Sequence, residues 1–223
     1  MSHPENLKAS EVASIAFVLI CCFAASLGMA FNIDGIKESF NLTNADAGKL
    51  ISLEMFSIAL GNFFFARLTH ITNSKKVFFI GASVIFLFNL LSVLATDPLH
   101  LAFFRIPTGL ALGAVAATCA GRIARSHKPD INFGVINSAV GFMGVFMAFT
   151  LPRALGLDFP ISSSFNLTGI DGLYLVYGIC ALFAVLIASR TPDDNEKKSQ
   201  TRNQSAKTLR IGWLALVGIG IMF

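Results

Sequence analysis

Hydrophobic residues form six long runs in this chain, and short polar segments separate them. Each run approaches the roughly 20 helical residues needed to cross about 30 Å of bilayer hydrocarbon. The runs are residues 12–31, 50–66, 77–95, 99–121, 131–151 and 173–189. Because the second and sixth are short, we expect their helices to take in flanking residues or to lie where the bilayer thins. The pattern predicts an all-α integral membrane protein with six spans.

The chain after the sixth run has a different character. Residues 191–210 are polar and charged without helical periodicity, which is typical of a flexible linker. Residues 211–223 are apolar, but they would rise only about 20 Å as a helix, too little to span a bilayer. The sequence predicts a six-helix bundle over 1–190, a cytoplasmic linker over 191–210 and the start of a seventh helix over 211–223. This order indicates a six-plus-six plan cut just after its midpoint.

Composition supports the bilayer as the solvent of this protein. The chain has 223 residues, of which 54% are hydrophobic and 13% are charged, and its mean hydropathy is +0.68. A soluble domain carries about 25% charged residues, so this chain has too few to cover a soluble surface. A soluble enzyme and a disordered or collagen-like chain are therefore excluded.

The sequence carries no motif of a catalytic or metal site. No Walker A motif, HExxH motif or hydrolase elbow is present, and the four cysteines lie in apolar runs without a CxxC pair. We therefore expect no catalytic residue, no metal and no cofactor. A net charge of +4 is compatible with nucleic-acid binding. The Lys and Arg residues flank the apolar runs, however, which is a membrane pattern, so we expect no nucleic-acid partner.

The positive charges are distributed unequally between the two sides of the predicted membrane domain. Thirteen of the 17 Lys and Arg residues lie in the N-terminal segment and in the second, fourth and sixth connections. The opposite side has only Lys37, Lys49 and Arg153. Cytoplasmic loops of membrane proteins are enriched in Lys and Arg. We expect a multi-pass protein of the cell membrane, the inner membrane for a bacterial source, with a cytoplasmic N-terminus.

Two charged residues fall inside the apolar runs. Glu54 lies in the second run and Arg105 in the fourth, both about 7–9 Å from the outer end of their helices. An ionisable group within a membrane helix is costly unless it faces a wet cavity or a partner, so both are candidates for substrate binding or ion coupling. Their similar depth allows them to pair. The alternatives are that Glu54 reaches outer water and that helix carbonyls hold Arg105 for a structural purpose.

Small residues follow Arg105 at helical spacing. Gly109, Gly113 and Ala117 share one helix face, which predicts close packing against another helix. Pro107 removes a backbone donor near Arg105 and is expected to bend the helix. A charge, a bend and a packing face in one helix are typical of a cavity that opens and closes.

The run from Phe104 to Ala114, which contains Arg105, Gly109 and Gly113, resembles the RxxxGxxxG motif in the fourth helix of the major facilitator superfamily. The loop between the second and third runs resembles the signature GxLxDRxGRRxxxxxG of the same family. This gating loop keeps Leu68, Lys75, Lys76 and Gly81 but has Ala66, His70, Ile71 and Asn73 in place of Gly, Asp, Arg and Gly. Asn tolerates the left-handed turn of a loop Gly, whereas His70 lacks the fixed anion of the family's gate.

The resemblance implies the N-terminal half of a secondary transporter, built from two three-helix repeats. Its implied activity is the movement of a small-molecule substrate by gradient-driven alternating access, with proton coupling as an option. Arg105 would bind an anionic group or modulate a proton site, and Glu54 is the weaker coupling candidate. Ser26 and Asn137 are further cavity candidates, with Asn89 a weaker one.

The partners expected for this reading are the lipid bilayer and, if the chain is a fragment, a C-terminal six-helix half. Two other interpretations stay open. One is a truncated, non-transporting membrane remnant, and the other is a half-size transporter that acts as a homodimer.

Overall fold

The computed structural model describes residues 7–69, 71–156 and 169–191, and these residues form eight α-helices. Five of the helices are long and apolar enough to cross a membrane. In chain order the helices are α1 (Ala9–Cys22), α2 (Ala24–Leu27), α3 (Met29–Phe40), α4 (Asn44–Leu68), α5 (Ser74–Val93), α6 (Pro98–Ala124), α7 (Pro129–Leu155) and α9 (Gly169–Arg190). Residues 192–223 lie outside the described residues, so the linker over 191–210 and the seventh helix stay predictions.

The first apolar run does not form one uninterrupted helix, and in this respect the prediction for residues 12–31 is wrong. The helical path breaks at Phe23 and Gly28 and continues to Phe40, beyond the predicted end. The side-chain amide of Asn32 donates a hydrogen bond to the Ala25 carbonyl across the second break, at 3.0 Å. Because the helix is interrupted there, this buried carbonyl lacks a backbone donor, and the Asn32 amide takes that donor's place.

Local capping residues set where three of the longer helices begin. The Thr43 hydroxyl accepts the backbone N–H of Asp46 at the start of α4, and the Asp97 carboxylate accepts that of His100 at the start of α6. At α5, the Asn73 side chain accepts the Lys75 N–H. Such caps satisfy amides that have no partner inside the helix. As expected, the two short apolar runs take in flanking residues, and α4 and α9 reach 25 and 22 residues.

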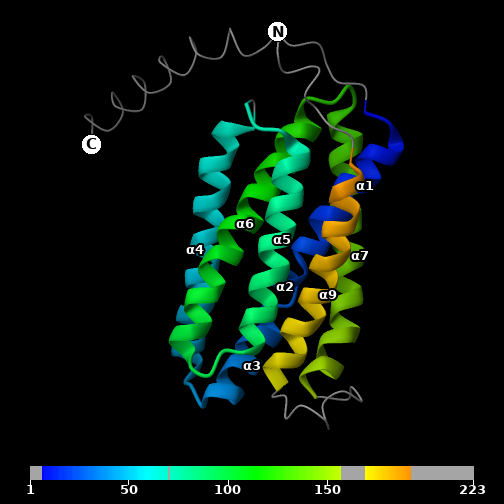
Figure 1. The fold of residues 1–223 in the computed structure, drawn as a ribbon. Coiled ribbons are helices and arrows are strands. Elements are labelled where there is room, and N and C mark those ends of the chain that lie inside the picture. Colours follow the sequence, from blue (N-terminus) through cyan, green and yellow to red (C-terminus); the bar gives the residue numbers. More distant parts are fainter. Residues whose placement is uncertain (1–6, 70, 157–168, 192–223) are drawn as a thin grey trace, which may run out of the picture.

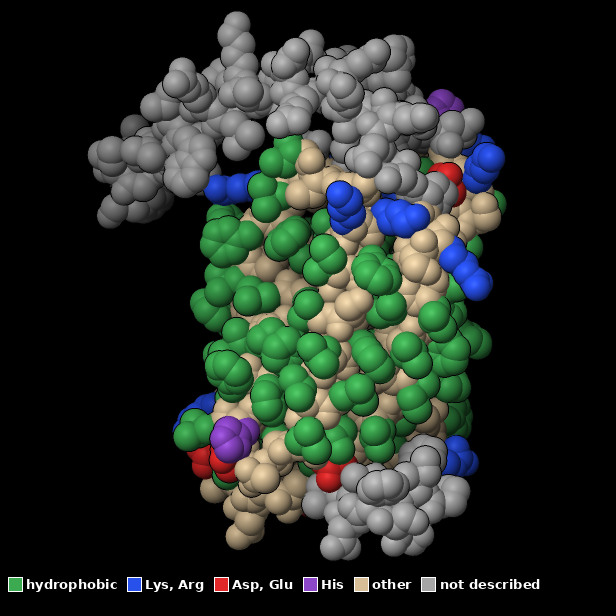
Figure 2. Space-filling model, viewed as in Figure 1, with side chains coloured by type: hydrophobic (Ala, Val, Ile, Leu, Met, Phe, Trp, Pro, Cys, Tyr) green, Lys and Arg blue, Asp and Glu red, His purple; other side chains and the backbone are tan. Residues whose placement is uncertain are grey.

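The helices run along a common direction and form an elongated bundle (Figure 1). Helices α4 and α5 both pack on α6, and α9 packs on α5, α1 and α7. The largest completely buried side chains include Tyr174, Tyr177 and Phe78. On the face seen in Figure 2, hydrophobic side chains cover the middle of the bundle, and the charged residues lie toward its two ends.

The start of α1 and the end of α9 lie at the same end of the bundle, together with the connections α4–α5 and α6–α7 (Figure 1). We call this end the basic end. Its described basic residues are Lys8, Arg67, Lys75, Lys76, Arg122, Arg125, Lys128 and Arg190. The opposite end carries Lys37, Lys49 and Arg153 among the described residues.

Candidate functional site

A buried ion pair joins α4 to α6. The Nη1 atom of Arg105 lies 3.5 Å from Oε1 of Glu54, and the two side chains are 3% and 6% exposed. Both helices enter from the opposite end, and the two residues lie about 10–15 Å along them. A carboxylate this deeply buried does not reach outer water, so that alternative for Glu54 is wrong.

Helix α5 supplies two further partners of the guanidinium. The Nη2 atom of Arg105 donates to Oδ1 of Asn89 at 2.9 Å and to Oγ of Ser92 at 3.0 Å. Asn89 and Ser92 in turn donate to the carbonyls of Ile85 and Phe88, which turns their acceptor atoms toward Arg105. In the described part of the chain, the guanidinium of Arg105 is therefore held by side chains, and not by the helix carbonyls of the structural alternative.

Helix α9 covers the same guanidinium with an aromatic ring. The Cζ atom of Arg105 lies 4.6 Å from the centre of the Tyr174 ring, a cation–π contact. Tyr177 stands edge-on to Tyr174, with ring centres 6.2 Å apart, and its hydroxyl donates to Oδ1 of Asn32 at 2.7 Å. A polar cluster thus crosses the bundle from α4 through α6 and α9 to α3.

Sequence reasoning missed Asn32, Ser92, Tyr174 and Tyr177 as members of this cluster. One signal was available, because Tyr174 and Tyr177 are the only two tyrosines of the chain and lie three residues apart in one apolar run. Residues at this spacing share a helix face.

Some donors in the described cluster make no hydrogen bond, although one of them, Nη1 of Arg105, lies in the ion pair with Glu54. The Nε and Nη1 atoms of Arg105 and the Tyr174 hydroxyl are buried and have no hydrogen-bond partner among the described residues. A carboxylate is the natural ligand for such donors, because guanidinium N–H groups bind it in a paired geometry. Within the same residues, no group of three His, Cys, Asp or Glu side chains is placed to hold a metal ion.

Close packing of α6 on α4 sets the distance between the two charges. A Cβ atom on Gly109 would lie 2.7 Å from the Glu54 carbonyl and from Cβ of Ser57, and one on Gly113 would collide with the backbone of Ile58. Both glycines therefore face the α4 backbone. The absence of a side chain there lets the Arg105 and Glu54 side chains meet across a narrow gap.

The other cavity candidates make no hydrogen bond to the cluster in the described residues. Asn137 is exposed on α7, and no hydrogen bond links it to Arg105 or Glu54 in the described part of the chain. Ser26 lies on α2, half-buried, and its hydroxyl has no hydrogen-bond partner within the described ranges.

The gating loop lies at the basic end, away from the ion pair. His70 is outside the described residues. Asn73 has φ −75° and ψ 118°, so its backbone is extended and does not use the left-handed turn that Asn would tolerate in place of a loop glycine. Its side chain caps α5 instead. Lys75 is half-buried and Lys76 is exposed.

Comparison with known proteins relates most of the chain to one family. The family model of the Major Facilitator Superfamily matches residues 13–223. A gallate transporter of Pseudomonas putida is 28% identical over 150 residues. The aligned stretch covers 61% of this chain and 33% of that transporter, so the match spans about a third of the relative's length.

Proposed function

Because the chain belongs to the Major Facilitator Superfamily, a family of transporters and not of enzymes, we propose that it takes part in moving a small organic anion across the membrane. The observation that supports an anion is the buried guanidinium of Arg105, whose Nε and Nη1 atoms make no hydrogen bond within the described ranges and which lies against an aromatic ring. Transport would proceed by gradient-driven alternating access, without ATP.

The proposed substrate class is an aromatic carboxylate. The relative with a named substrate transports gallate, an aromatic carboxylate. Its carboxylate group would suit the Arg105 donors, and its ring would suit the tyrosine pair Tyr174 and Tyr177. A buried Arg with fixed side-chain partners selects for the planar two-oxygen geometry of such a group.

In the proposed mechanism Glu54 and the substrate compete for Arg105. When no substrate is bound, Glu54 occupies the binding position at Arg105, because each charge offsets the burial cost of the other. A substrate carboxylate takes the place of Glu54 beside Arg105. Glu54 then takes up a proton, which removes the negative charge that has lost its partner. This exchange would couple substrate movement to a proton gradient.

We propose that the basic end faces the cytoplasm, because Lys and Arg are enriched in cytoplasmic loops. The Glu54–Arg105 pair would then lie nearer the outer face. A C-terminal six-helix half is the proposed partner against which this bundle moves, with Gly109 and Gly113 keeping the α4–α6 unit rigid.

The test is uptake of radiolabelled gallate by cells that express the chain. We expect uptake above the vector control, and its loss in Arg105→Ala, while Arg153→Ala on the exposed end of α7 keeps it. Uptake at the normal rate in Arg105→Ala would overturn the role of Arg105. No uptake by the unmodified chain would favour the non-transporting remnant, and cross-linking in membranes distinguishes the homodimer.

A further inference from the structure

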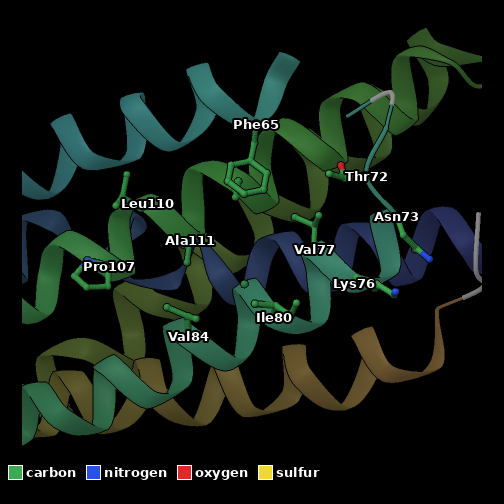
Figure 3. A pocket seen from close by; sticks show the side chains of 12 residues that line it. Phe65, Thr72, Asn73, Lys76, Val77, Ile80, Val84, Pro107, Leu110 and Ala111 are labelled. Atoms are coloured by element: carbon green, nitrogen blue, oxygen red, sulfur yellow. The ribbon is translucent and has the colours of Figure 1, made fainter. Parts of the chain in front are cut away.

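A groove lies between α4 and α5, with α6 as its floor (Figure 3). It encloses about 490 Å³. Helices α4 and α5 each pack along α6 but scarcely touch one another, and this separation leaves the groove open. Exposed side chains that line the groove, such as Ile80 on α5 and Leu110 on α6, place it on the outside of the bundle.

The groove is separate from the Arg105 site, because it uses the other face of α6. Pro107 and Ala114 line its floor. They follow Arg105 by two and nine residues, which places both about half a turn away around the helix. A ligand in the groove would therefore not touch the guanidinium.

The lining changes from polar to apolar along the groove. Thr72, Asn73 and Lys76 lie at one end, and Figure 3 shows Lys76 and Asn73 together there, with Pro107 far from them. The remaining lining residues are apolar or glycine: Phe65, Val77, Ile80, Gly81, Val84, Pro107, Leu110, Ala111 and Ala114. An apolar slot with one cationic end has the polarity of a lipid that carries an anionic headgroup.

The length and position of the groove fit one leaflet of a bilayer. Lys76 and Val84 are eight residues apart on α5, a rise of about 12 Å. Half of a hydrocarbon core of about 30 Å is about 15 Å. The polar end lies at the basic end of the bundle, where Lys76 is exposed at the start of α5. A lipid of the adjoining leaflet would thus meet the cation with its headgroup and the slot with its chain.

We propose that this groove binds an anionic glycerophospholipid, with one acyl chain between α4 and α5 and the phosphate beside Nζ of Lys76. Charge complementarity favours this occupant over a neutral lipid, since basic residues next to the membrane surface attract anionic headgroups. The acyl chain of the lipid enters the groove sideways from the leaflet, because the exposed Ile80 and Leu110 border the opening.

The experiment is native mass spectrometry of the full chain, titrated with palmitoyl-oleoyl phosphatidylglycerol or with phosphatidylcholine of the same chains. We expect one tightly held phosphatidylglycerol and weaker phosphatidylcholine binding. Lys76→Gln should weaken phosphatidylglycerol about fivefold, the effect of one basic residue near a membrane surface. Lys128→Gln removes the same charge at the same end but outside the groove, and it should leave the affinity unchanged.

A second pair of variants tests the acyl-chain slot. Val84→Phe fills the groove and should abolish the tightly held lipid, whereas Val145→Phe, on the exposed face of α7, should not. Equal binding of the two lipids, or equal losses in Lys76→Gln and Lys128→Gln, would overturn the headgroup site. Undiminished lipid in a folded Val84→Phe variant would overturn the slot. If Val84→Phe does not fold, the lysine pair still decides.

Discussion

The guanidinium of Arg105 and the carboxylate of Glu54 face each other at 3.5 Å between α6 and α4, with both side chains almost fully buried. Removing one partner of a buried pair leaves a charge without compensation. Because a guanidinium stays protonated, Glu54→Gln cannot relieve the charge of Arg105 by a proton shift. The stability of the bundle therefore depends on the same two charges that are proposed to bind the substrate and the proton.

We predict that the two charges are strongly coupled in stability. Glu54→Gln should lower the free energy of unfolding by about 3–5 kcal/mol, because it leaves a buried charge unpaired. Arg105→Gln should lower it by less, because an unpaired Glu54 can take up a proton. The double variant should lose less than the sum of the single losses. Thermal unfolding of the four proteins in one detergent measures the coupling. Additivity within about 0.5 kcal/mol would show that the pair does not interact.

The glycine face of α6 is predicted to be intolerant of a methyl group. Gly109→Ala should destabilise the bundle by about 1–3 kcal/mol, because its Cβ would press on the α4 backbone and Ser57. Gly141→Ala is the matched control, since a Cβ there meets nothing within 4 Å. It should be neutral or stabilise by up to about 1 kcal/mol through helix propensity. Equal melting temperatures for both variants would contradict the close approach of α6 to α4.

The two tyrosines of α9 are predicted to respond differently to loss of the hydroxyl. Tyr177→Phe leaves the buried Oδ1 of Asn32 without its donor, which should cost about 1–3 kcal/mol. Tyr174→Phe removes a hydroxyl that has no hydrogen-bond partner in the described chain, so its melting temperature should hardly change. Thermal unfolding distinguishes the two.

The same pair of variants separates stability from transport. If the free Tyr174 hydroxyl meets the substrate, Tyr174→Phe should lower gallate uptake while it leaves the protein as stable as before. A larger loss of stability in Tyr174→Phe than in Tyr177→Phe would contradict the assigned hydrogen bonds.

The proposed orientation predicts which end reagents reach from outside the cell. The cysteines Cys21, Cys22, Cys119 and Cys180 are all buried, so the unmodified chain should react little with a membrane-impermeant maleimide. Lys37→Cys at the opposite end should be labelled in intact cells. Lys128→Cys at the basic end should be labelled only after the membrane is permeabilised, and labelling in intact cells would reverse the orientation.

The order of the long helices was predicted from the sequence for a local reason, and capping residues account for where three of them begin. Apolar runs of membrane length report burial in lipid, and capping residues such as Thr43, Asn73 and Asp97 satisfy the first amides of a helix without distant partners. The Glu54–Arg105 contact was predictable as well, because two rare charges at equal depth in apolar helices have few other ways to offset their burial.

Only the tertiary structure decided what surrounds that pair. The alignment of α5 and α9 against α6 placed Asn89, Ser92 and Tyr174 around Arg105, and no local pattern specifies such an alignment between distant segments. The packing likewise placed Tyr177 and Leu151 beside Gly28, in the space where a Cβ would lie. The groove under Lys76 exists because α4 and α5 share α6 as a neighbour and not each other. The sequence determined which segments enter the membrane, and the packing of those segments decided which polar groups meet there.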